Sequence, residues 1–188
     1  MTRRDTIAEA VLASRVLLTR YLVGFDDTNH TRQAPNLPNH VAWVLGHCAL
    51  TLQRAAQKID NRPLAEADFS PPPTELARPR ATPSGRSATL VMATRYDTET
   101  VSFQSVPVDN PSIYPRLTRC TEIFDRACES YADLLRSLPE QRLDEMIRWG
   151  AIEIPVWATA LRVAFHNSTH CGQIVDLRRA LGMRQIFM

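Results

Sequence analysis

The sequence predicts an all-α protein, an up-down four-helix bundle with a long crossover connection between helices 2 and 3. Four segments carry apolar residues at helical spacing. Nine of the 13 prolines lie between Pro63 and Pro115, which separates the second helical segment from the third. A length of 188 residues suits one core, so residues 1–188 are predicted to form a single domain.

The first helix is predicted over residues 4–24. Its apolar stripe follows spacings of four, three, four and four residues and consists of Ile7, Val11, Ser14, Leu18 and Leu22. Thr6 and Glu9 have the spacing of a capping box, and Gly24 is the expected stop. The polar segment 25–36 is predicted to be a loop in which His30 is solvated and takes no part in metal binding.

The second helix is predicted over residues 38–59, with Asn36 or Asn39 as its cap. His47 lies in the middle of this apolar segment, and Trp43 precedes it by one turn on the same side. His40 stands two turns before His47, roughly 10 Å away along the axis, which is too far to share a metal ion. We expect His40 to contact the substrate or to support the site.

Residues 60–114 form the predicted crossover. A structureless loop of this length is unusual in a compact domain, so part of it should be ordered, with residues 87–101 as a short helix. Because loops on a fixed scaffold commonly determine specificity, this crossover is the expected substrate-selecting segment.

The third helix is predicted over residues 115–138, where apolar residues alternate spacings of three and four from Leu117 to Leu138. A short strand is predicted at 147–154. Pro155 opens the fourth helix, which is expected to end near Gly182.

Two histidines of the fourth helix, His166 and His170, lie four residues apart and therefore on one helix face, about 5–6 Å apart at their roots. Their pair falls on the border between the apolar and polar faces, where a ligand pair at the rim of a cleft would lie. Two unrelated helix histidines are the alternative, since this motif alone is a weak signal. His47 supplies a third imidazole on another helix, so the sequence predicts a metal site of His47, His166 and His170.

Composition limits the remaining classes of function. The net charge is +2 and no long run of basic residues occurs, so nucleic-acid binding receives no support. The chain starts without a secretory signal and contains no apolar run near 18 residues, which predicts no membrane span. Its four cysteines fall inside predicted helices, where we expect them to be buried and unpaired. Unpaired cysteines are typical of a reducing compartment, so the expected location is cytoplasmic.

The motifs N-H-V-A-W-V-L-G-H (39–47) and H-N-S-T-H-C-G-Q-I (166–174) resemble those of the DinB/YfiT-like superfamily. That resemblance implies one metal-binding histidine on the second helix, His47, and a pair on the fourth, His166 and His170. It also implies a connector that crosses the bundle near the metal, and a homodimer. Phe165, placed on the polar side of the fourth helix, fits a dimer because an exposed aromatic side chain there needs cover.

Three imidazoles suit zinc, nickel, copper or iron, with zinc or nickel as the first choices of divalent ion. They leave a coordination position open, as in catalytic rather than structural sites. Asn167 stands where a zincin has glutamate, which removes that class. No general base is evident. His40 is the nearest titratable candidate, and Asp97 and Glu99 of the crossover are the next candidates.

Characterised members of the resembled superfamily include transferases and isomerases that use small thiols. The resemblance therefore implies a metal-dependent enzyme that transfers a low-molecular-weight thiol, its co-substrate, to a small electrophile. Two alternatives stay open: a non-catalytic metal-binding stress-response bundle, and a metal-dependent hydrolase that uses bound water.

Overall fold

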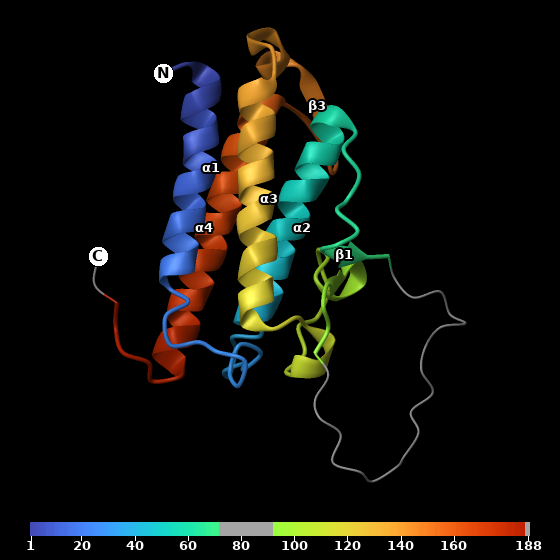
Figure 1. Cartoon of the computed structure of the whole chain (residues 1–188). Helices are drawn as coiled ribbons and strands as arrows, with labels where there is room; N and C mark the ends of the chain where they lie inside the picture. Colours follow the sequence, from blue (N-terminus) through green and yellow to red (C-terminus); the bar gives the residue numbers. More distant parts are fainter. Residues whose placement is uncertain (72–91, 187–188) are drawn as a thin grey trace.

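Four long helices make up most of the protein (Figure 1). The computed structural model describes residues 1–71 and 92–186. The helices are α1 (Arg3–Arg20), α2 (Val41–Asp60), α3 (Leu117–Ser137) and α4 (Val156–Ala180). Both α1 and α2 pack against α3 and α4, and their apolar stripes form one shared core. The predicted all-α four-helix bundle is confirmed.

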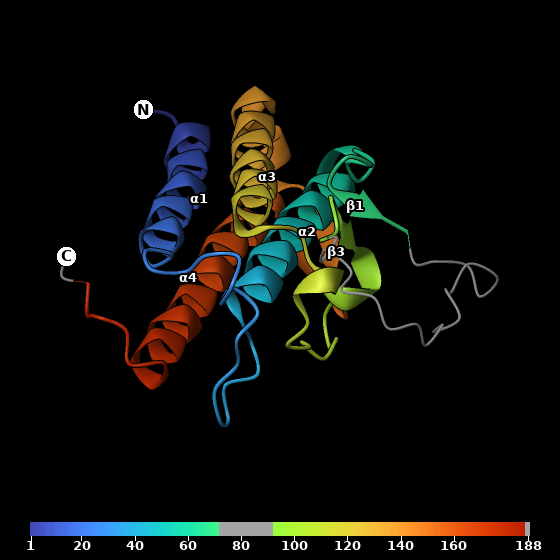
Figure 2. The ribbon, with the colours of Figure 1, turned by 60° about the horizontal axis from the view of Figure 1, so that its bottom comes forward.

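The long crossover lies between α2 and α3, as predicted. It returns the chain to the end of the bundle where α2 began, so α2 and α3 run in the same direction, while α1 and α4 run in the other (Figure 1). In both views the described parts of the crossover, residues 60–71 and 92–114, lie on the outer side of α2, away from α1 (Figures 1 and 2). This arrangement brings the crossover close to the middle of α2.

The crossover is attached to α2 by a small parallel sheet and a buried tyrosine. Strand β1 (Phe69–Ser70) pairs with β2 (Tyr96–Asp97), and the short 3-10 helices η2 (Thr98–Thr100) and η3 (Pro111–Ile113) follow. The Tyr96 side chain is fully buried, and its hydroxyl donates to the Ala42 carbonyl at 2.8 Å. Residues 87–91 of the predicted short helix lie outside the described residues, and residues 92–101 hold β2 and η2 in its place.

Both predicted caps of the first two helices are wrong. The capping box of α1 consists of Thr2 and Asp5, because the helix already begins at Arg3, and Thr6 lies within its first turn. The cap of α2 is His40, whose Nδ1 accepts from the Trp43 amide at 3.2 Å, and not Asn36 or Asn39. An imidazole nitrogen here performs the role of the usual short polar cap.

A hairpin replaces the single strand predicted at 147–154. After η4 (Glu140–Asp144), strands β3 (Met146–Trp149) and β4 (Ile152–Pro155) pair in antiparallel register. Gly150 turns between them at a φ of 64°, a conformation that glycine adopts without steric cost. Pro155 then leads directly into α4, as predicted.

The four cysteines are buried and unpaired, as the sequence predicts. Across residues 1–71 and 92–186, no helix is long and apolar enough to cross a membrane.

Candidate metal centre

The three predicted ligands meet where α2 faces α4. His47 comes from the middle of α2, and His166 and His170 from successive turns of α4. The Nε2 atom of His166 lies 3.1 Å from that of His47 and 3.2 Å from that of His170. Among the described residues, these three histidines form the group with metal-ligand geometry, with one nitrogen of each within 4.8 Å of the others.

Hydrogen bonds determine which nitrogen of two rings faces the centre. His47 Nδ1 lies 2.9 Å from the Val101 carbonyl oxygen, and His170 Nδ1 lies 2.8 Å from Gln173 Oε1. Because oxygen atoms of this kind only accept, each Nδ1 must carry the proton and donate it. The Nε2 atoms of His47 and His170 therefore point lone pairs at the centre, as metal binding requires.

The orientation of Gln173 is determined by a second donor. Asn39 Nδ2 donates to the same Gln173 Oε1 at 2.9 Å, so this atom accepts two hydrogen bonds. The chain Asn39–Gln173–His170 thereby links the residue before the α2 cap to a ligand on α4. Supporting bonds of this kind orient metal ligands and raise their affinity.

Burial keeps the three rings neutral. Burial, followed by the neighbouring His170 and His47, lowers the pKa of His166 to about 3. Burial and then His47 lower the pKa of His170 to about 4, against the bond to Gln173, which raises it. Burial likewise lowers the pKa of His47. Neutral imidazoles at pH 7 need no deprotonation before they bind a metal ion.

The crossover forms one wall of the centre. The Trp43 indole stacks on the His47 ring, with centroids 4.5 Å apart and planes 9° from parallel. Its Nε1 donates to Ser105 Oγ at 2.9 Å, and the Val101 carbonyl holds His47 itself. The sequence indicated that Trp43 and His47 share a side, but it contained no signal for a backbone carbonyl of the crossover.

The donor set and its spacing fit a divalent metal ion. Metal–nitrogen bonds of about 2.0–2.1 Å place two nitrogens of a tetrahedral ion roughly 3.3 Å apart. The spacings of 3.1 and 3.2 Å between Nε2 atoms are close to that value. The His166 Nδ1 makes no hydrogen bond with a described residue, so its ring is the least constrained of the three.

His40 and His30 lie away from these ligands. His40 is fully buried; its Nδ1 caps α2 and its Nε2 donates to the Val108 carbonyl at 3.1 Å. Both nitrogens thus serve backbone groups, and a catalytic role for His40 stays a prediction. The solvated position predicted for His30 is wrong, because this ring is fully buried with Nε2 bonded to the Pro115 carbonyl.

The fold and the site together define a four-helix bundle in which three histidines, from its second and fourth helices, could hold a metal ion. A family model described as the DinB superfamily matches residues 10–174, so the chain belongs to the DinB superfamily. A crystal structure of a conserved protein from Enterococcus faecalis is similar over 97% of this chain and 99% of that one, with a TM-score of 0.67 and 14% identity. At that identity the likeness shows the fold alone. No curated protein matches the sequence.

Proposed function

We propose that the protein is a metal-dependent enzyme that transfers a low-molecular-weight thiol to a small electrophile. The observation that carries the proposal is the convergence of three neutral imidazoles through their Nε2 atoms. Three protein ligands leave coordination positions open, which is the arrangement of catalytic rather than structural sites. Zinc and nickel are the ions that we expect, because both accept imidazole ligands.

The surroundings of the rings favour a thiol over water as the nucleophile. Within the described residues, the hydrogen-bond partners of the three rings are the Val101 carbonyl, the Gln173 amide and the rings themselves. No carboxylate is among them to act as a base. When bound, a divalent ion lowers the pKa of a coordinated thiol, and a thiol starts from only about 8.5.

The residues of the chain would then position and shield the reactants. Val101 and Gln173 keep two ligand rings in place, and Trp43 covers one side of His47. The crossover next to the centre exposes Phe103 by 77% and Val106 by 78%. These apolar side chains are the surface that we propose for the apolar part of the electrophile, which assigns substrate selection to the crossover.

A panel of thiols and electrophiles, assayed with metal-loaded and metal-stripped protein, tests the proposal. Loaded protein should accelerate transfer with at least one thiol, and His166→Ala should abolish both metal binding and transfer. Thr169→Ala, on the same helix but exposed, is the matched control and should retain both. Elemental analysis should give about one ion per wild-type chain.

Three outcomes would contradict the proposal of a thiol transferase. Equal transfer rates with metal-loaded and metal-stripped protein for every thiol would disprove it. Ester or amide cleavage without thiol would favour a metal-dependent hydrolase, and metal binding without turnover a stress-response bundle. The proposed compartment is the cytoplasm, since four buried, unpaired cysteines suit reducing conditions.

A further inference from the structure

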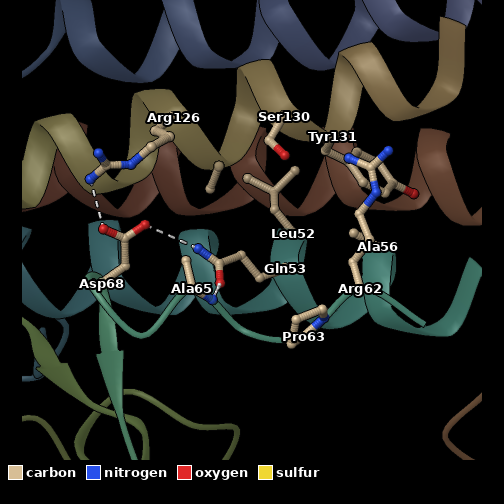
Figure 3. A pocket seen from close by; sticks show the side chains of 11 residues that line it. Leu52, Gln53, Ala56, Arg62, Pro63, Ala65, Asp68, Arg126, Ser130 and Tyr131 are labelled. Carbon is tan, nitrogen blue, oxygen red and sulfur yellow. Dashed lines mark hydrogen bonds and ion pairs between the residues drawn. The ribbon is translucent and has the colours of Figure 1, made fainter. Parts of the chain in front are cut away.

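A hollow of about 140 Å³ lies between α2 and α3, beneath the segment that leads into β1 (Figure 3). Its lining comes from α2, α3 and residues 62–68, and includes no residue of α4. It is therefore separate from the histidine centre, which lies where α2 faces α4. Leu52, Ala56 and Ala127 supply an apolar surface inside it.

One side chain that lines this hollow has a buried hydroxyl without a partner among the described residues. Tyr131 lines the hollow and is 1% exposed, and its hydroxyl makes no hydrogen bond with any described residue. Burial raises the pKa of Tyr131, so the hydroxyl stays protonated and available as a donor. An unpaired buried hydroxyl costs free energy, which a ligand oxygen that accepts from it would recover.

Two arginines stand at opposite ends of the hollow. Arg62 reaches towards Tyr131 from the α2 side, while Arg126 lies at the other end and bonds Asp68 (Figure 3). Asp68 Oδ1 accepts from Arg126 at 2.7 Å and from Arg119 at 3.0 Å, and Arg119 also pairs with Glu122 at 3.3 Å, so the charges at that end are balanced and Arg62 is the arginine left to bind an anion. Arg62 pairs with Asp60 through Nε alone, so the rest of its guanidinium can donate.

The size and chemistry of the hollow define the ligand. It is far larger than the roughly 30 Å³ of one water and smaller than the roughly 300 Å³ at which drug-sized pockets begin. We propose that it binds a small monocarboxylate, with the carboxylate between Arg62 and Tyr131 and a short alkyl chain against Leu52 and Ala56. Guanidinium and hydroxyl donors are the groups that hold a carboxylate.

Titration with sodium butyrate at constant ionic strength tests the site, observed through backbone amide NMR signals. Butyrate should shift signals of residues 52–56, 62–68 and 126–131 in the full chain, whereas n-butanol, which has the same alkyl chain without the charge, should not. Arg62→Gln should weaken the butyrate Kd about tenfold or more, because a charge-assisted bond is lost. Arg32→Gln, an exposed arginine near the other end of α2, should leave it unchanged.

Tyr131→Phe separates binding from folding. Without butyrate the variant should melt at the same temperature as wild type or higher, because an unpaired buried hydroxyl is removed. With butyrate the wild type should gain more in Tm than the variant. Equal gains in both proteins, equal Kd values for Arg62→Gln and Arg32→Gln, or tighter binding of inorganic phosphate than of butyrate would each overturn the proposal.

Discussion

At the scale of single residues, the centre is defined by the proton that each imidazole carries. The Val101 carbonyl and Gln173 Oε1 hold protons on the Nδ1 atoms of His47 and His170, so two lone pairs face inward without any conformational search. The His166 ring has no such partner among the described residues. A bound metal ion should therefore fix the orientation of the His166 ring more than that of the other two rings.

Replacing Gln173 with alanine should weaken metal binding while the three ligands remain. The variant removes the acceptor that holds His170 Nδ1, and loss of such support typically costs about 10–100-fold in affinity. Competition with a chromophoric chelator measures this change. Asn39→Ala, which removes only the donor to Gln173, should have a smaller effect of the same sign. An unchanged affinity in Gln173→Ala would show that the ring is held by packing alone.

His40 should make the protein less stable in acid. Burial, the largest cause, lowers its folded-state pKa from 6.5 to about 4. Between these values the unfolded chain binds the proton and the folded chain does not, so stability falls as pH falls from about 6.5 to about 4 and then levels off. The full difference for this group is on the order of 3 kcal/mol.

Urea unfolding of wild type and His40→Asn across that pH range isolates this contribution. Asparagine can cap α2 but cannot titrate. The difference in unfolding free energy between the two proteins therefore reports on His40, because the other histidines contribute equally to both. Wild type should lose more stability than the variant on acidification. Parallel pH profiles would show that the buried ring has no part in it.

At the scale of elements, the crossover is held to α2 by a fit that permits no side chain at Gly46. A Cβ at Gly46 would lie 2.5 Å from the Tyr96 ring, and that ring is fully buried. Strand β2, which contains Tyr96, continues through η2 to Val101, whose carbonyl oxygen accepts a hydrogen bond from His47. Packing of the crossover and geometry of the centre are thus coupled.

Gly46→Ala should therefore destabilise the protein by about 1–3 kcal/mol, because the buried Tyr96 ring has to move. Gly172→Ala is the matched control within α4, since a Cβ at Gly172 would meet no other atom within 4 Å. Alanine there should stabilise by about 1 kcal/mol through helix propensity. Denaturant midpoints measure both, and equal shifts of the two variants would contradict the close packing.

The helices and the three ligands were predictable from the sequence because their signals are local. Spacings of three and four residues define the stripe of α3, and four residues separate His166 from His170. The burial of His30 and His40 was not predictable, because the groups that bond their rings lie far along the chain: the Pro115 carbonyl for His30 and the Val108 carbonyl for His40. The role of Val101 was not predictable either, because Val101 contacts His47 through its backbone carbonyl, a group that every residue has.

At the scale of the whole molecule, α4 and the hairpin before it expose apolar side chains. Phe165 is 68% exposed, as its position on the polar side of the helix predicted. Trp157 is 39% exposed two turns earlier, and Met146 and Ile152 of the hairpin are 58% and 45% exposed. Exposed apolar groups on adjoining elements of the chain favour an interface.

We predict that the protein is a homodimer through this surface, with Phe165 at its centre. Light scattering at tens of micromolar should give twice the chain mass of 21.2 kDa. Phe165→Ser should shift the mass towards one chain, because an aromatic anchor near an interface centre contributes a large share of the binding free energy. Phe103→Ser, which removes a ring of the crossover that is 77% exposed, should leave the dimer intact. Since Phe165 adjoins His166, metal content has to be measured in the same samples; a metal-loaded wild-type monomer would disprove the dimer.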